Sequence, residues 1–256
     1  MDASDILGIT SLVLVIGGMA ILLMGKHRTK SEGMQTMLHG IVPIIAAVSY
    51  FAMYTKQGQV TLPTDAAAEA GQAATRVFYY ARYADWSVTT PLLLLSLGLS
   101  AMNTGEKRSD LLTGLVLADI LMIVTSFIFG ASETGWEKWS WFGISTVSFL
   151  FVYYVIWGPQ LAVANRQRED VRAAYKRHAA ILSVLWLAYP FVLAASPDGA
   201  HVIDSKLAVL LVAILDVLSK VAYGFITIAS DKSVTDKDLA HPEPEVTKLR
   251  EPVFAR

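Results

Sequence analysis

The chain has 256 residues, of which 54% are hydrophobic and only 17% are charged, and its mean hydropathy is +0.47. Soluble domains carry about 25% charged residues, so this composition indicates a membrane protein. The formal net charge of −1 gives no reason to expect nucleic acid as a partner. The absence of cysteine excludes disulfides, thiol chemistry and cysteine metal ligands, and we expect no metal site.

Seven stretches are long and apolar enough to cross a bilayer, which takes about 20 residues each. The first follows only five residues that contain no basic segment, so we expect a retained helix and not a cleaved signal peptide. The sequence thus predicts an all-α bundle of seven transmembrane helices over residues 1–230. Residues 231–256 are polar and are predicted to form a disordered tail. The predicted spans are 6–25, 37–56, 78–101, 110–130, 139–161, 179–197 and 207–229.

Lysine and arginine are distributed unevenly among the connecting loops. Ten lie in the first, third and fifth loops, against at most four in the others. Because cytoplasmic loops carry the excess of positive charge, we expect the N-terminus outside and the tail in the cytoplasm of a multi-pass protein of the cell membrane. The longest connection, 57–75, would then be external, and QVTLP at 59–63 suggests a short hairpin within it.

Five charged side chains lie well inside the predicted spans: Arg82, Asp85, Asp119, Asp216 and Lys220. Each costs about 2.5 to 3.5 kcal/mol on membrane-insertion scales, so each marks a candidate functional site. Purely structural ion pairing within the bundle is the alternative explanation.

The spacing of these residues argues against that alternative. Asp216 and Lys220 are four residues apart and share a helix face. A desolvated lysine loses its proton readily and is suited to forming a Schiff base with an aldehyde. Once protonated, such a cation needs a carboxylate counterion, and Arg82 would balance the surplus negative charge. One face of the third span carries Arg82, Asp85, Trp86, Thr89 and Leu93.

Aromatic side chains at mid-depth indicate what the aldehyde is. Membrane aromatics usually form interfacial belts or general packing. Several tryptophans at the depth of a buried lysine suggest instead a slot for a long, flat, conjugated ligand. The candidates are Trp86, Trp141, Trp186 and Tyr189, with Met122, Phe149 and Pro190.

Several segments resemble the microbial rhodopsins, and most closely the bacteriorhodopsin-like proton pumps. The resemblance covers residues 6–230. It implies all-trans retinal bound covalently to Lys220, a transporter and not an enzyme, and a homo-oligomer in the lipid bilayer. The segments that carry it are RYADWSVTTPLLLL (82–95), VLADILMI (116–123), WFGIST (141–146), WLAYP (186–190) and LDVLSK (215–220).

The resemblance also implies roles for single residues. Asp85 matches the primary counterion and proton acceptor, with Thr89 hydrogen-bonded beside it. Asp216 matches the second counterion, and Arg82 the arginine that moves during proton release. Trp86 and Trp186 match the pair that sandwiches the polyene. The other implied contacts are Tyr50 at the second counterion, the Thr90–Asp119 pair between two helices, and Leu93, Met122, Ser126, Trp141, Ser145, Phe149, Tyr189 and Pro190 around the chromophore.

Ser96 is the informative departure from the family. It stands where the archetype has a carboxylic acid that reprotonates the Schiff base, and a serine hydroxyl cannot donate a proton at useful pH. His39 is placed beside position 96 by the resemblance, and the ordinary pKa of histidine, about 6.5, suits proton shuttling. An inert interfacial histidine, with reprotonation through water, is the alternative.

Other departures concern the pocket and the outer side. Leu193 replaces a third tryptophan and should loosen the pocket, while Leu93 predicts green absorption. Ala46 leaves Asp85 without the histidine partner of some relatives, and Phe142 argues against a docked carotenoid antenna. On the outer side the candidate release carboxyls are Asp198 and Asp204, the second in place of Ala208, although loop aspartates are commonly only solvated.

The function that this resemblance implies is a light-driven outward proton pump. A photosensor that signals to a transducer is the alternative, because a missing donor carboxylate lengthens the photocycle. A light-gated channel would need additional acidic residues along the second span, and 39–56 contains none.

Overall fold

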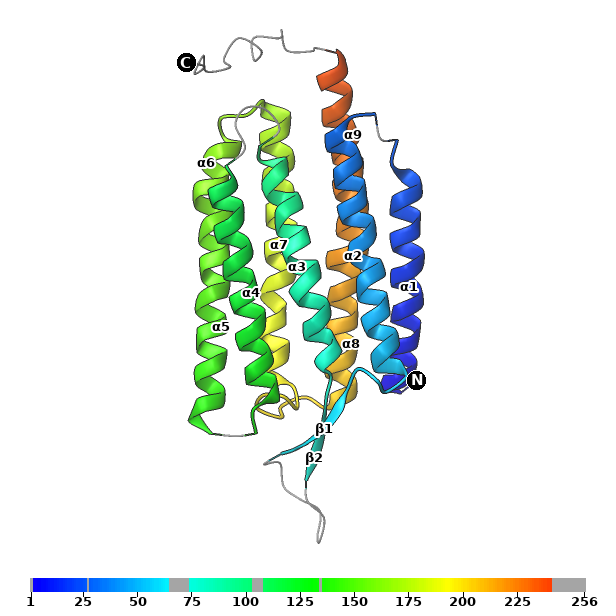
Figure 1. Cartoon of the computed structure of the whole chain (residues 1–256), viewed down its shortest axis with the longest axis vertical. Coiled ribbons are helices and arrows are strands. Elements are labelled where there is room, and N and C mark those ends of the chain that lie inside the picture. Colours follow the sequence, from blue (N-terminus) through cyan, green and yellow to red (C-terminus); the bar gives the residue numbers. More distant parts are fainter. Residues whose placement is uncertain (1, 27, 65–73, 103–107, 134, 241–256) are drawn as a thin grey trace, which may run out of the picture.

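The protein is a bundle of seven long helices, as the sequence predicts (Figure 1). A computed structural model of the chain describes residues 2–26, 28–64, 74–102, 108–133 and 135–240. Two of the seven helices are continuous through a π-helical turn. The elements are α1 (Ala3–Met24), α2 (Lys30–Tyr54), α3 (Tyr80–Ser100), α4 (Ser109–Ala131), α5 (Trp136–Val155) with η1 (Ile156–Gln160) and α6 (Leu161–Ala164), α7 (Glu169–Ala195), and α8 (Ser205–Asp216) with η2 (Val217–Ala222) and α9 (Tyr223–Ala240).

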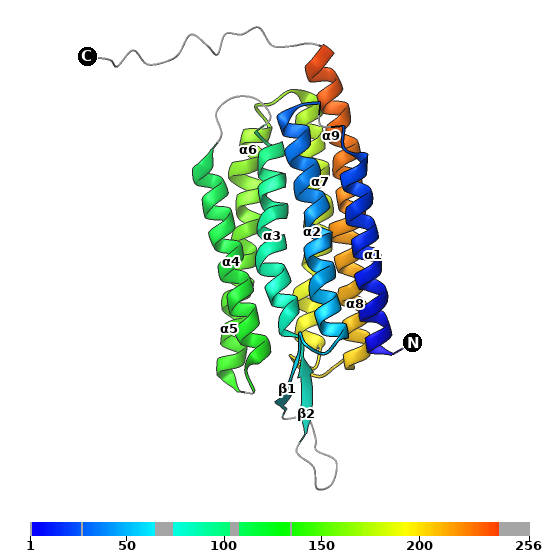
Figure 2. The ribbon, with the colours of Figure 1, turned by 45° about the vertical axis from the view of Figure 1, so that its right-hand side comes forward.

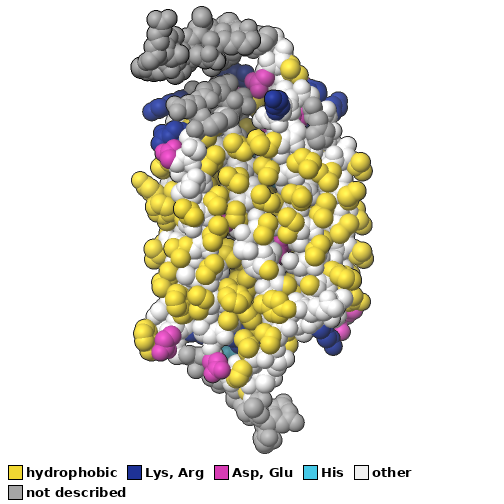
Figure 3. Space-filling view, viewed as in Figure 1, with side chains coloured by type: hydrophobic (Ala, Val, Ile, Leu, Met, Phe, Trp, Pro, Cys, Tyr) yellow, Lys and Arg dark blue, Asp and Glu magenta, His cyan; other side chains and the backbone are white. Residues whose placement is uncertain are grey.

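The outside of the bundle is apolar over its middle and charged at its ends (Figure 3). Six of the described helices are apolar and long enough to cross a membrane. The seventh, α3, runs alongside them (Figure 2) and carries Arg82 and Asp85 among its buried residues. The side chains that the membrane interior would penalise therefore face other helices and not lipid.

Most of the helices extend past at least one end of their predicted spans, because hydropathy detects the apolar slab and not the polar turns beyond it, whereas α3 lies within its predicted span. The helix α2 begins at Lys30, where the Thr29 side chain accepts the Glu32 amide. The prediction of a disordered tail is wrong for 231–240, which continue α9. Asp236 of that segment forms an ion pair with Arg28, which favours an ordered helix. The rest of the predicted tail, 241–256, lies outside the described residues.

The predicted hairpin is present. Strands β1 (Val60–Pro63) and β2 (Thr75–Phe78) pair antiparallel, with Val60 opposite Phe78. Arg76 of β2 is buried and forms an ion pair with Asp198 in the loop between α7 and α8. Its guanidinium also donates to the carbonyls of Gly130, at 2.6 Å, and Ser132 at the end of α4. The hairpin, which connects α2 to α3, thus contacts both the connection after α4 and the connection between α7 and α8 at one end of the bundle.

Asp198 is therefore not a solvated loop aspartate, since only 5% of it is exposed. Burial raises the pKa of its carboxyl, and the Arg76 guanidinium opposes that shift. Removing the Arg76 guanidinium should raise the pKa of Asp198 further. At high pH the protein would then be destabilised by an unpaired buried carboxylate, and this loss of stability should disappear as falling pH protonates Asp198.

We expect Arg76→Gln to lower the free energy of unfolding of the detergent-solubilised protein by about 3–5 kcal/mol near neutral pH. Thermal denaturation would show this as a lower midpoint. The loss should shrink as the pH is lowered toward roughly 4. The double variant Arg76→Gln/Asp198→Asn should regain much of the stability at neutral pH. An equal loss at both pH values would contradict the buried-pair explanation.

Candidate functional site

Lys220 lies in the centre of the bundle between two carboxylates. Its Nζ is 2.5 Å from Asp85 Oδ2 and 3.1 Å from Asp216 Oδ1, and each of the three residues is at most 2% exposed. Helix α3 supplies Asp85, and α8 ends at Asp216 just before the π-helical turn η2, which holds Lys220. Such turns occur frequently at functional sites. The predicted face of α3 is buried along its length.

The two carboxylates differ in their hydrogen bonds. Asp216 accepts from the hydroxyl of Tyr50 at 2.7 Å and from that of Tyr189 at 2.8 Å. The indole of Trp86 also points at it, at 3.4 Å. Asp85 contacts Lys220 through Oδ2, while its Oδ1 has no hydrogen-bond partner among the described residues. Donors stabilise the negative charge on Asp216, so Asp85 is the carboxyl with an oxygen free to take a proton.

Thr89 lies beside Asp85, as expected, and Arg82 forms no ion pair with either carboxylate among the described residues. The Thr89 hydroxyl donates to the backbone carbonyl of Asp85 at 2.9 Å. Arg82 is buried, its Nε has no partner in the described part of the chain, and its guanidinium lies 5.4 Å from the centre of the Tyr79 ring. Because no ion pair joins Arg82 to Asp85 or Asp216 among the described residues, its charge acts on them through space.

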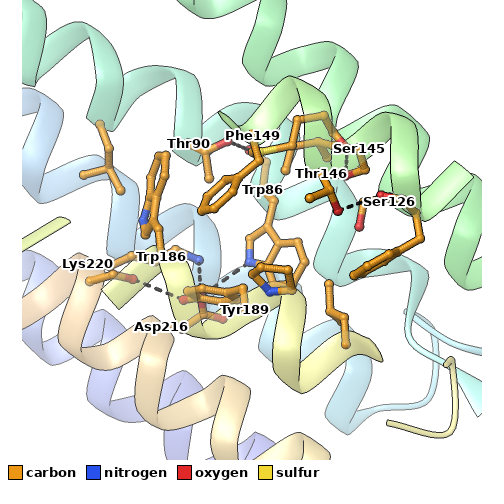
Figure 4. Close-up of a pocket in the computed structure, with 17 residues that line it drawn as sticks. Trp86, Thr90, Ser126, Ser145, Thr146, Phe149, Trp186, Tyr189, Asp216 and Lys220 are labelled. Atoms are coloured by element: carbon orange, nitrogen blue, oxygen red, sulfur yellow. Dashed lines mark hydrogen bonds and ion pairs between the residues drawn. The ribbon is translucent and has the colours of Figure 1, made fainter. Parts of the chain in front are cut away.

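A cavity of about 670 Å³ extends from Lys220 between α3, α4, α5 and α7. Lys220 and Asp216 lie at one end of it, and Ser126, Ser145 and Thr146 at the other (Figure 4). Ten of the expected contacts line it, namely Trp86, Thr90, Leu93, Met122, Ser126, Ser145, Phe149, Trp186, Tyr189 and Pro190. Its walls are mainly apolar, which suits a long hydrophobic ligand.

The cavity also corrects the expected set of contacts. Trp141 does not line it, whereas the neighbouring Phe142 does. Two consecutive residues point about 100° apart on a helix, and the rotation of α5 turns Phe142 toward the cavity and Trp141 away from it. Leu193, which replaces the third tryptophan of the family, lines the cavity as expected. Lining residues that the sequence analysis did not identify are Ile123, Thr146 and Ser219, each adjacent in sequence to one that it did.

On the other side of Lys220, His39 is fully buried and is not an interfacial histidine. Its Nε2 lies 2.7 Å from Ser96 Oγ, as predicted. The amide of Gln35 completes the cluster, because its oxygen accepts the Ser96 hydroxyl at 2.5 Å and its nitrogen donates to the Ser96 carbonyl at 3.1 Å. Sequence reasoning missed Gln35, although it precedes His39 by four residues and therefore shares its face.

Two remaining expectations have different outcomes. The Thr90 hydroxyl donates to Asp119 Oδ2 at 2.7 Å and links α3 to α4, as expected. Asp204 caps α8 by accepting the Leu207 amide at 2.8 Å and is exposed. Its carboxylate therefore does not face the interior.

Replacing Lys220 with methionine should destabilise the protein without any ligand present. The side chain has similar length, but two buried carboxylates lose their cation, at a cost of about 3–5 kcal/mol. Adding Asp85→Asn should recover part of the loss. Thermal denaturation in detergent measures both effects, and an unchanged midpoint for Lys220→Met would contradict the charge balance described here.

The chain is similar to bacteriorhodopsin-like proteins over nearly its whole length. The family model described as bacteriorhodopsin-like protein matches residues 3–234. Archaerhodopsin-2 from Halobacterium sp. (strain aus-2) is 34% identical over 241 residues, covering 93% of this chain and 88% of that protein. Sensory rhodopsin-2 from Natronomonas pharaonis is 28% identical over 215 residues, covering 84% and 83%. The crystal structure of a light-driven proton pump from Leptosphaeria maculans has a TM-score of 0.82 at 28% identity, covering 90% of this chain and 96% of that one.

Proposed function

The chain belongs to the bacteriorhodopsin-like family of microbial rhodopsins, and from that premise we propose that it is a light-driven outward proton pump of the plasma membrane, with retinal on Lys220. The observation that carries the proposal is the contact between Lys220 Nζ and an incompletely hydrogen-bonded carboxylate, Asp85. A nitrogen that holds a proton, next to an acid that can receive it, is the minimum for a transfer step.

The residues around the cavity fit retinal. Lys220 provides the amine at one end, Trp86 and Trp186 provide flat apolar surfaces, and Phe142 and Leu193 leave room beyond them. When bound as a protonated Schiff base, retinal supplies a light-driven isomerisation from the all-trans to the 13-cis form. The mainly apolar walls exclude water, so the proton at Nζ has Asp85 as its nearest acceptor.

The unequal hydrogen bonding of the two carboxylates determines where the proton goes. Tyr50 and Tyr189 already donate to Asp216, so protonating it would weaken two charge-assisted hydrogen bonds. Asp85 has a free oxygen and loses only its contact with Nζ. Proton transfer from Lys220 Nζ to Asp85 neutralises both groups and leaves Arg82 and Asp216 as the balancing charges.

Release to the outside would take place near Arg82. Once Asp85 is neutral, its attraction for the Arg82 guanidinium is lost. Asp198 is a carboxylate paired with Arg76 and lies within electrostatic reach of Arg82, so it can accept a proton moving outward and pass it to the solvent. Asp204 is occupied as a helix cap, and we assign release to Asp198 and not to it.

Reprotonation would come through Ser96 and His39. Ser96 relays a proton through its hydroxyl but cannot be its source. His39 contacts that hydroxyl, and its Nδ1 has no partner among the described residues, so the ring can take a proton at one nitrogen and give one from the other.

A photosensory role is the alternative, favoured by the serine at position 96. Without a carboxyl there, reprotonation of Nζ slows, and a long-lived state suits signalling. The similarity of the chain to a sensory rhodopsin supports the photosensory alternative.

Cells that express the chain with added all-trans retinal should acidify their medium in light, and a protonophore should abolish the effect. Asp85→Asn should give a red-shifted pigment that moves no protons, because no carboxylate then receives the proton from Nζ. Lys220→Ala should give no colour. External pH and absorption spectra measure these outcomes.

A coloured wild-type protein that photocycles without moving protons would contradict the pump and favour the sensor. A visible chromophore retained in Lys220→Ala would contradict the attachment site.

His39→Gln should slow reprotonation of Nζ at least about tenfold, since a positioned acid commonly contributes 10²–10⁴. His178→Gln is a matched control. His178 is also buried and packs against the same ring, Tyr223, but makes no contact with Ser96. Flash photolysis measures the decay, and equal effects of the two substitutions would make His39 a packing residue only.

A further inference from the structure

A second hollow, of about 380 Å³, opens between α2, α7 and α9. It lies at the end of the bundle where lysine and arginine gather (Figure 3), which the charge distribution predicts to be cytoplasmic. Gln35 is part of its lining and also bonds Ser96. One side chain therefore separates the hollow from the His39–Ser96 pair. The lining residues are Ser31, Glu32, Gln35, Ser100, Val171, Ala174, Asp231, Val234 and Thr235.

The hollow contains two carboxyls in different situations. Glu32 is held by Arg28, whose backbone amide lies 2.9 Å and Nε 3.2 Å from Glu32 Oε2. These bonds keep Glu32 as a carboxylate. Asp231 forms no ion pair among the described residues, and its Oδ2 is buried without a hydrogen-bond partner. The other walls of the hollow carry no charge, so Asp231 faces Glu32 and, beyond it, Arg28. Asp231 is thus the carboxyl that can hold a proton.

A line of buried polar groups leads inward from Asp231. Thr227 and Tyr223 precede it by four and eight residues on the same face of α9. Their hydroxyls are buried and close enough to interact with each other, and neither bonds to any other group of the described chain. The rings of Tyr223 and His39 are in contact, with centroids 5.5 Å apart. Buried polar atoms without protein partners normally bond ordered water, so this line is suited to hold a water chain.

We propose that Asp231 is the proton-collecting carboxyl for uptake, which supplies His39 and Ser96 through water held by Thr227 and Tyr223. The proposal rests on the pump function above. Eight residues of helix span about 12 Å, too far for direct transfer from Asp231 to the level of Tyr223, so water must bridge the gap. Asp231 gives up one proton inward, and the resulting carboxylate takes one from the bulk solvent at the mouth of the hollow.

Asp231→Asn keeps the size of the side chain and removes its exchangeable proton. In the full-length, retinal-loaded protein, flash photolysis should show reprotonation of Nζ slowed about tenfold near neutral pH. The rate should also fall about tenfold per pH unit as the pH rises, because the proton would then come from solvent. Sodium azide, whose conjugate acid is a small weak acid that carries protons, should restore the rate. In the wild type the rate should vary little with pH.

Asp238→Asn is the matched control, because it removes a carboxyl from the same helix at a position that pairs with Arg168 and does not line the hollow. It should leave the rate within about twofold. The double variant His39→Gln/Asp231→Asn should be no slower than the slower single variant, since both act on one path.

Equal rates for Asp231→Asn and Asp238→Asn would overturn the proposal. So would a slowing that neither depends on pH nor responds to azide, which would indicate a structural effect. A wild-type protein that forms no pigment or moves no protons would instead defeat the pump function. A pumping wild type with an unaffected Asp231→Asn variant would defeat only the role of Asp231.

Discussion

The structure depends on keeping one ammonium group, that of Lys220, in the interior of a membrane protein. Removing a cation from water costs several kcal/mol unless a well-placed anion compensates for it. Asp85 and Asp216 compensate from two different helices, so α3 and the α8–η2–α9 helix must meet at one depth. The seven-helix arrangement is what brings these groups together and shields them from lipid.

Charge balance alone would give a stable ion pair, and the proposed pump needs a further asymmetry. What permits directed proton transfer is that the two carboxylates are unequally satisfied. Tyr50 and Tyr189 both donate to Asp216, whereas Oδ1 of Asp85 has no hydrogen-bond partner among the described residues. The same side chains that stabilise the buried charge therefore also select which acid receives the proton.

Helical spacing was sufficient to predict the parts of the site that lie on one helix. The face of α3 that contains Asp85 follows from residues three and four apart, and so does the pairing of Asp216 with Lys220. Spacing could not decide whether Trp141 or Phe142 faces the cavity, because the rotation of α5 is set by packing against other helices. The ion pair between Arg76 and Asp198 joins segments 122 residues apart, and no local pattern indicates such a contact.

The length of the helices was the least predictable feature of the fold, and it has functional consequences. Hydropathy placed the end of the last span at 229, yet α9 continues to Ala240 and carries Asp231 to the rim of a hollow. A carboxylic acid at position 96 would stand in a water-poor interior, where its charged form is costly. With serine at position 96, the proton-collecting acid can instead lie at the rim of the hollow, where water reaches it and it regains a proton easily. The longer path that results is the physical reason to expect slower uptake than in relatives with a donor beside the chromophore.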